Sequence, residues 1–310
     1  MSYQNIPGFS KKFERDCLER WRLIEPELPA EGVAVDIGAA EGYFCRQIAE
    51  RTNLLAIAVE KHRGRVVFQH RWLNDSYLGK VVSCCGRFDT DFAKRLAATP
   101  EWFDVTLLMS VLHWINSDDF LKAIASMSGK VVIEIPDLND TKATGQKFMA
   151  RLREIGSERE YFEKITGRSV RLLGKVAAHT YPHRNLWIIE GDLYRENRTP
   201  HINYGKRTGI TYVQEFVAGR LSYKKRSKKL PWIPGINLAT LKELGVTWPG
   251  IRYWRAKIAD SIDALDDKAN DLRIHNVIIS REKISWIDTF HKAGRNTITE
   301  DLDNLVKELT

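Results

Sequence analysis

The stretch Val33 to Cys45, VAVDIGAAEGYFC, decides the fold. It opens as a short apolar run that ends on Asp36, passes through a loop of small residues from Gly38 to Gly42, and continues as a helix-compatible segment to about Glu50. A strand that turns tightly into a helix leaves backbone N–H groups at the strand's carboxyl end, where α/β sheets bind ligands. The stretch therefore predicts a nucleotide-type site in an α/β fold.

The spacing of this loop indicates which nucleotide it binds. A dinucleotide fingerprint reads G-x-G-x-x-G, whereas this loop reads G-A-A-E-G and carries Glu41, a negative charge that a pyrophosphate disfavours. A ligand without phosphate fits better. The next apolar run, residues 54–59, ends on Glu60. In nucleotide-binding folds, an acid about 20 residues after the glycine loop accepts hydrogen bonds from the ribose hydroxyls, and Glu60 is in that position.

In this combination the two segments resemble class I S-adenosylmethionine (SAM)-dependent methyltransferases, whose glycine loop follows an Asp-ended strand and whose second strand ends in an acid. The resemblance implies a Rossmann-like seven-stranded sheet. A third strand, Val81 to Cys85, precedes Phe88 and Asp89, which in this family would lie against the adenine ring and accept from its amino group. Asp89 equally fits a helix cap, because Asp-x-x-Phe opens a periodic stretch. The cofactor contacts that the resemblance implies are Asp36, Gly38, Ala40, Gly42, Tyr43, Glu60, Phe88, Asp89 and Ser110.

The fourth strand, residues 103–109, runs into Ser110 to Ile115, SVLHWI. This resembles the S-V-x-H-H-I that many small-molecule and sugar methyltransferases carry where they meet the substrate. His113 is therefore a candidate general base, because an imidazole near neutrality can take a proton from an attacking hydroxyl. The alternative is that His113 only lines the cofactor pocket or caps the next helix.

The fifth strand, residues 130–137, contains Glu134 within an apolar run, and a buried carboxylate needs a partner. Glu134 is a candidate catalytic or SAM-contacting residue, with a structural salt bridge as the alternative. A helix is expected at residues 10–26 and a charged helix at 143–166. Two more strand-like runs follow, so residues 1–194 are expected to form the methyltransferase domain.

Residues 195–310 carry a different signature, which predicts a smaller, mainly helical domain resembling a protein-kinase large lobe. Thr211 to Leu221 resembles a kinase hinge, an apolar strand that ends in an acid before a glycine loop. Asp271 precedes Asn276 by five positions, the spacing of a kinase base and a magnesium-binding Asn, and Asp288 follows as a second metal-binding candidate.

Three departures weaken the kinase resemblance. Ala269 stands where a histidine is usual, and Asp288 is followed by Thr289 rather than by Phe-Gly. Only about 20 residues separate the last methyltransferase strand from the hinge, too few for the small lobe that positions the phosphates. We therefore expect a segment without kinase activity that retains at most a Mg²⁺ site at Asn276 and Asp288.

The order of the two parts resembles the bacterial O-antigen chain-terminating bifunctional methyltransferases/kinases, in which the kinase phosphorylates the terminal sugar of a polysaccharide and the methyltransferase methylates the product. The motifs that carry this resemblance are RDC (15–17), VAVDIGAAEGYF (33–44), GRFD (86–89), FDVTLLMSVLHWI (103–115), VIEI (132–135), E-x-x-x-G-R-L (215–221), DLRIHNVII (271–279) and ISWID (284–288).

Composition sets the remaining expectations. With 43% hydrophobic and 28% charged residues, the chain reads as an ordinary soluble protein, and it has neither an apolar leader nor a membrane-spanning run. Its four cysteines form no C-x-x-C pair, which favours a reducing, cytoplasmic location without a zinc site. The net charge of +8, with a basic run at 224–229, favours an acidic partner.

Three functions are consistent with these features. The leading one is a SAM-dependent O-methyltransferase acting on a glycan or sugar-phosphate-type acceptor. The alternatives are a nucleic-acid methyltransferase, favoured by the net charge, and a SAM-binding scaffold whose kinase-like segment is not catalytic.

Overall fold

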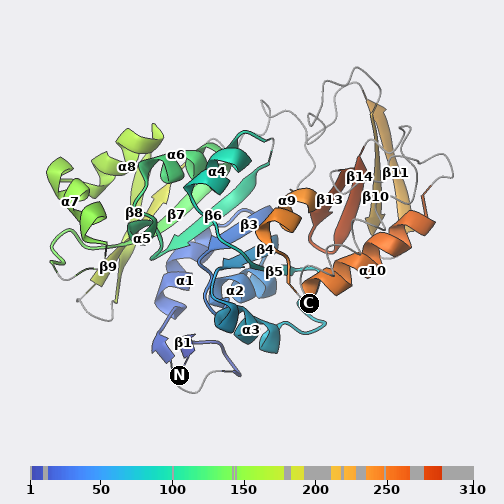
Figure 1. Cartoon of the computed structure of the whole chain (residues 1–310), viewed down its shortest axis with the longest axis horizontal. Helices are drawn as coiled ribbons and strands as arrows, with labels where there is room; N and C mark the ends of the chain where they lie inside the picture. Colours follow the sequence, from blue (N-terminus) through green and yellow to red (C-terminus); the bar gives the residue numbers. More distant parts are fainter. Residues whose placement is uncertain are drawn as a thin grey trace.

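The described residues form two large β-sheets, of seven and five strands, and a small two-stranded sheet near the N-terminus (Figure 1). The computed structural model describes residues 2–9, 13–99, 101–141, 143, 145–177, 183–191, 211–217, 220–227, 235–247, 249–265 and 276–287. Within these residues, no helix is long and apolar enough to cross a lipid bilayer.

The larger sheet has seven strands in the order β5-β4-β3-β6-β7-β9-β8. The strands are β3 (Glu31–Ile37), β4 (Asn53–Glu60), β5 (Val81–Cys85), β6 (Phe103–Met109), β7 (Ser128–Pro136), β8 (Val170–Ala177) and β9 (His183–Ile189). The first five are parallel, and β9 is antiparallel to both β7 and β8. This confirms the predicted Rossmann-like sheet, whose strand order reverses between β3 and β6.

Helices cover both faces of this sheet, which explains why its parallel strands are buried along nearly their whole length. One face packs on α1 (Leu18–Ile24), α2 (Tyr43–Arg51) and the end of α3 (Arg63–Trp72). The other packs on α4 (Thr90–Ala97), α6 (Asp118–Ser126), α7 (Gln146–Ile155) and α8 (Glu158–Thr166). Figure 1 shows the two groups on opposite sides of the sheet.

Two predicted helices differ in the structure. In place of one helix over residues 10–26, the segment contains β2 (Phe13–Arg15), α1 and a short 3-10 helix, η1 (Glu25–Glu27). Strand β2 pairs in parallel with β1 (Ser2–Gln4). The helix predicted at 143–166 is two helices, because Gly156 adopts a left-handed φ of 80° and Ser157 caps a new start.

The smaller sheet is antiparallel, with the order β11-β10-β14-β13-β12. Its strands are β10 (Thr211–Val217), β11 (Arg220–Ser227), β12 (Ile236–Asn237), β13 (Val277–Ser280) and β14 (Lys283–Ile287), and it is accompanied by α9 (Leu238–Leu244) and α10 (Gly250–Asp263). The described part of residues 195–310 thus contains a sheet as well as helices. Glu215 lies inside β10 instead of ending it, since the strand continues to Val217.

The smaller unit packs directly on the edge of the larger sheet. The amide of Cys85 donates to the carbonyl of Gly245 (2.9 Å), and the amide of Thr247 donates to the carbonyl of Ser83 (2.8 Å). Residues 245–247 therefore extend the large sheet beyond β5. Gly86 follows at once, and a Cβ there would lie 2.3 Å from the carbonyl oxygen of Leu244, so only glycine allows this approach.

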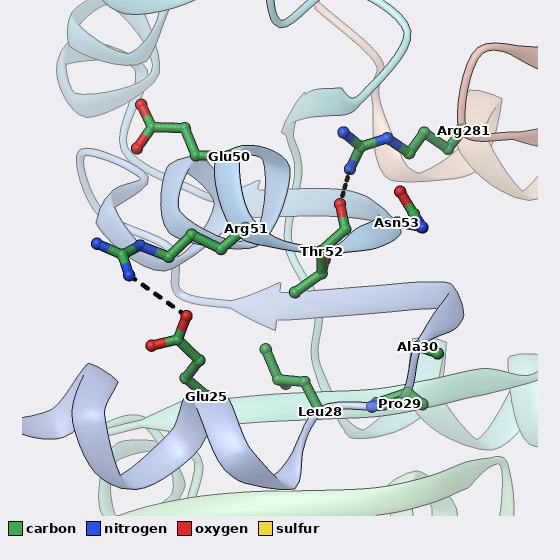
Figure 2. Close-up of a pocket in the computed structure, with 9 residues that line it drawn as sticks. All are labelled: Glu25, Leu28, Pro29, Ala30, Glu50, Arg51, Thr52, Asn53 and Arg281. Atoms are coloured by element: carbon green, nitrogen blue, oxygen red, sulfur yellow. Dashed lines mark hydrogen bonds and ion pairs between the residues drawn. The ribbon is translucent and has the colours of Figure 1, made fainter.

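A second contact joins the two units at the amino-terminal ends of the strands of the large sheet. Arg281, in the turn between β13 and β14, donates to the carbonyls of Ala49 (3.0 Å), Thr52 and Leu54 (3.3 Å) at the end of α2. It borders a pocket of about 430 Å³, shown in Figure 2, in which Arg51 also pairs with Glu25. Helix-terminal carbonyls lack partners within their own helix, and Arg281 supplies one.

Replacing Arg281 with methionine should therefore lower the free energy of unfolding by about 1–3 kcal/mol, because buried carbonyls lose a charged donor. Chemical denaturation of the whole chain measures this. Arg51→Met is the matched control, since its ion pair at the same pocket is half exposed and should contribute below about 1 kcal/mol. Equal losses in both variants would show that Arg281 does not secure the contact.

Candidate functional site

A cleft of about 780 Å³ opens at the carboxyl ends of β3, β4, β5 and β6, the edge of the sheet predicted to bind a ligand. Its volume lies in the range of small-molecule sites. Of the residues predicted to contact the cofactor, five line it: Gly38, Glu60, Phe88, Asp89 and Ser110. The pocket in Figure 2 lies at the other edge of the sheet and contains none of the predicted site residues.

The glycine loop and the end of β4 are tied together by backbone hydrogen bonds. The amides of Gly38 and Ala39 donate to the carbonyl of Val59 (2.8 and 3.1 Å), and the amide of Ala40 donates to Oε2 of Glu60 (3.0 Å). The turn after Asp36 and the acid of the second strand, which the sequence predicted to act together, are therefore in contact.

Backbone conformation explains the small residues of this loop. Gly38 has a φ of 78°, and a Cβ there would lie 2.5 Å from a methyl group of Val111. Ala40 also has a left-handed φ, 51°, which is strained for a residue with a side chain. The tight turn leaves the cleft open above Gly38.

Glu60 is fixed at the floor of the cleft. Its side chain is only 3% exposed, Oε1 accepts from the amide of His62 (2.8 Å), and Arg65 lies 3.8 Å from Oε2. A carboxylate held by backbone amides on either side is pre-oriented to accept hydrogen bonds from a ligand.

Asp36 lies beneath the loop and does not line the cleft. It is 1% exposed, and neither carboxylate oxygen has a hydrogen-bond partner among the described residues. Burial, and then the charge of Glu60, raise the pKa of Asp36 to about 7 although Arg15 opposes the shift. Burial disfavours the charged form of a carboxyl group that has no hydrogen-bond partner, which is the physical reason for this raised pKa.

Three further predicted contacts, Ala40, Gly42 and Tyr43, shape the loop and lie outside the cleft lining. Gly42 begins α2 with a φ of 85° and faces the indole of Trp72. The amide of Tyr43 donates to Oε1 of Gln4 (3.0 Å).

Asp89 caps a helix, which was one of its two predicted roles, and its contact with adenine stays a prediction. Its Oδ1 accepts from the amide of Phe92 (3.0 Å) and so caps α4, while the residue also lines the cleft beside Phe88. The ring of Phe88 is 6% exposed and presents an apolar wall to the cavity.

Behind Ser110, outside the cleft lining, three arginines surround one carboxylate. We call Arg15, Arg20 and Arg184 with Glu134 the arginine cluster. Arg20 binds Glu134 through two nitrogens (2.9 and 3.2 Å), Arg15 pairs with the same carboxylate, and Arg184 lies 3.8 Å from it. Ser110, which lines the cleft, donates to Glu134 (3.0 Å) and accepts from Arg15 (3.1 Å) and Arg184 (3.0 Å). The left-handed φ of Ser110, 63°, aims its hydroxyl there.

Glu134 is therefore an ion-pair partner, the alternative that the sequence left open. Burial alone would raise the pKa of Glu134, but Arg15 and Arg20 outweigh burial and lower that pKa to about 2. A carboxylate this acidic is a poor general base.

His113 lies in α5 (Leu112–Ile115), 1% exposed and outside the cleft lining. Neither ring nitrogen has a hydrogen-bond partner among the described residues. Burial, and then the charge of Arg184, lower the pKa of His113 to about 3, so the imidazole is neutral and weakly basic. Its catalytic role stays a prediction. The adjacent Trp114 is 66% exposed and lines the cleft.

Sequence reasoning missed the arginine cluster and the contribution of Tyr3 to the cleft wall. Arg15 belongs to the RDC motif, but no sequence signal connects it with Glu134, 119 residues away. Arginines brought together by folding leave no local pattern.

The predicted metal and kinase residues are only partly described. Asn276 is buried directly before β13, whereas Asp271 and Asp288 lie outside the described residues. Among the residues whose placement is described, no three His, Cys, Asp or Glu side chains are grouped to hold a metal ion. The Mg²⁺ site stays a prediction.

Comparison with known proteins finds similarity in structure only: the sequence matches no protein-family model and no curated protein. A medium-resolution structure of the bifunctional kinase-methyltransferase WbdD aligns over 99% of this chain and 84% of its own, with 15% identity and a TM-score of 0.51.

A co-crystal structure of WbdD with a kinase inhibitor aligns over 92% of this chain and 65% of its own, with 14% identity and a TM-score of 0.49. This chain therefore spans about two-thirds of the length of that WbdD chain. A putative S-adenosylmethionine-dependent methyltransferase from Listeria monocytogenes aligns over 56% of this chain and 98% of its own, with 12% identity and a TM-score of 0.40. At these identities the comparison with WbdD shows the fold alone, which contains a Rossmann-like sheet.

Proposed function

We propose that this protein is a SAM-dependent O-methyltransferase. The observation that carries the proposal is the contact between Glu60 and the amide of Ala40 at the floor of the cleft. A ribose bound over Glu60 would direct adenine toward Phe88 and Asp89, and the methionine end toward Gly38. The contact predicted for Asp36 stays a prediction, because this carboxyl group lies beneath the loop and outside the cleft lining.

The acceptor we propose is a glycan or sugar-phosphate-type molecule that carries an anionic group. The arginine cluster holds three guanidinium groups against one carboxylate, which leaves positive charge beside Ser110 at the cleft wall. Arginine is suited to phosphate and carboxylate groups because its donors match their oxygens. The exposed indole of Trp114 offers a flat surface for the apolar face of a sugar.

The reaction is an in-line transfer. The acceptor oxygen forms a bond to the methyl carbon as the carbon–sulfur bond breaks, and neutral S-adenosylhomocysteine (SAH) leaves. Most of the rate gain comes from holding the two reacting atoms about 3–3.5 Å apart. An anionic acceptor oxygen needs no general base, which accords with the low pKa values of both His113 and Glu134.

Substitution of Arg184 with methionine tests the acceptor. Because a charged hydrogen bond contributes about 1.5–3 kcal/mol, kcat/KM for a phosphorylated glycan should fall by about 10- to 100-fold. The affinity for SAH should stay unchanged. Arg22→Met, at an exposed position of α1, is the control. If the wild-type protein methylated a dephosphorylated glycan with the same kcat/KM as the phosphorylated one, the proposal of an anionic acceptor would be excluded.

Nucleic-acid methylation is the second candidate, and the net charge of +8 favours it. It predicts that the log of the affinity for RNA or DNA falls steeply with log salt, and a flat response would exclude it.

SAM binding without SAH production on glycan, nucleic-acid and small-molecule acceptors would favour a scaffold. We propose no kinase activity; ATP-dependent phosphate transfer lost on Asp288→Ala would contradict this.

A further inference from the structure

We propose that strand β1, Ser2–Gln4, completes the cofactor site and that Tyr3 is a binding residue for the ribose and methionine half of SAM. The inference rests on the proposed function. It assigns a role to a segment outside the glycine loop and the strand ends. Tyr3 lines the same cleft as Gly38, Glu60 and Ser110.

Glu41 holds this segment in place. Its carboxylate, 6% exposed, accepts from the amides of Tyr3 (2.9 Å) and Gln4 (3.1 Å). The side chain of Gln4 in turn accepts from the amide of Tyr43, two residues beyond Glu41. The acid that made this loop unsuitable for a pyrophosphate thus faces the N-terminal segment, and the loop binds that segment with its own side chain and backbone.

The ring of Tyr3 is positioned between the two functional ends of the cleft. Arg65 lies 5.0 Å and Arg15 5.9 Å from the ring centroid, and the phenol oxygen accepts from Arg15 (2.9 Å). Arg65 also approaches Glu60, while Arg15 donates to Ser110. The ring therefore spans the distance from the ribose-binding acid to the Ser110 end of the cleft.

A molecule lying between Glu60 and Ser110 would be covered by this ring. An aromatic side chain supplies a large contact area with few rotatable bonds. The amides held by Glu41 keep the ring in position before the ligand arrives, so little conformational entropy is lost on binding.

Calorimetric titration of the full chain with SAH tests the inference. Loss of the ring in Tyr3→Ala should weaken binding about tenfold, because one aromatic contact surface is removed. Glu41→Gln should weaken binding in the same direction, since an amide offers one acceptor to two backbone N–H groups. Phe9→Ala is the matched control, since Phe9 lies beyond β1, is 44% exposed and is outside the cleft lining, and this variant should bind SAH as wild type does.

Hydrogen exchange supplies an independent readout. The amides of Tyr3 and Gln4 should exchange more slowly when SAH is added, and faster in Glu41→Gln than in wild type. Unchanged SAH affinity in both Tyr3→Ala and Glu41→Gln would overturn the inference while leaving the proposed function intact. Failure of the wild-type chain to bind SAH or SAM would overturn the proposed function and this inference with it.

Discussion

Replacing Glu60 with glutamine should weaken SAH binding by about 100-fold, the loss of charge-assisted hydrogen bonds to both ribose hydroxyls. The substitution preserves the size of the side chain and one acceptor for the loop. It removes the negative charge that lies at the floor of the cleft, 3% exposed and held by the amides of Ala40 and His62. The measurement is calorimetric titration with SAH.

Glu50→Gln is the control for this experiment. Glu50 lies on the outer surface of α2, where it pairs with Arg46 (2.9 Å) and does not line the cleft. Thermal unfolding of both variants checks that the loop still folds. If Glu60→Gln were to bind SAH as tightly as wild type, the cleft would not hold a ribose over this acid, and the methyltransferase proposal would lose its main support.

Replacing Glu134 with glutamine should have the largest effect on stability. The substitution leaves Arg20, which is 2% exposed, and Arg15 without their carboxylate. Removing one member of a buried ion pair costs about 3–5 kcal/mol, because the remaining charge is buried without compensation. We expect a fall in Tm on the order of 10 °C by calorimetry. Glu163→Gln, which removes an exposed pair with Arg159, should leave Tm nearly unchanged.

The pH dependence of stability gives a second readout for Glu134. Its pKa in the folded protein is about 2, below the ordinary value of 4.5. A carboxyl group with a lowered pKa stabilises the fold above its unfolded pKa, and the contribution disappears as pH falls through the folded value. Wild type should therefore lose more stability than Glu134→Gln between about pH 4.5 and pH 2. Parallel curves for the two proteins would mean that the arginines do not stabilise the ionised carboxylate.

Local sequence determined the large sheet and the floor of its cleft. Strand β4 ends on Glu60 and β3 ends one residue after Asp36, and the glycines that follow β3 allow a tight turn. Because parallel strands end at one edge of a sheet, the positions of Asp36, Glu60 and Asp89 followed from the order of the strands. The contact between Ala40 and Glu60 bears out that part of the reasoning.

Periodicity was less informative where turns interrupt it. The segment at 143–166 has one continuous helical pattern, yet Gly156 ends the first helix in a left-handed conformation and Ser157 starts another. The sequence indicated a strand near residue 211 but not the antiparallel sheet that contains it, because β10 pairs with β14, more than 60 residues further along the chain, beyond α9 and α10.

The strands of the large sheet, their approximate ends and the acid beside the glycine loop could be predicted from the amino-acid sequence. These features depend on residues that are close together in the chain. Only the tertiary structure decided how the polar side chains are paired. It placed Glu134 among three arginines, Glu41 under the amides of Tyr3 and Gln4, and Gly245 beside Cys85. The partners in each case are separated by tens to more than a hundred residues, so their pairing exists only once the chain has folded.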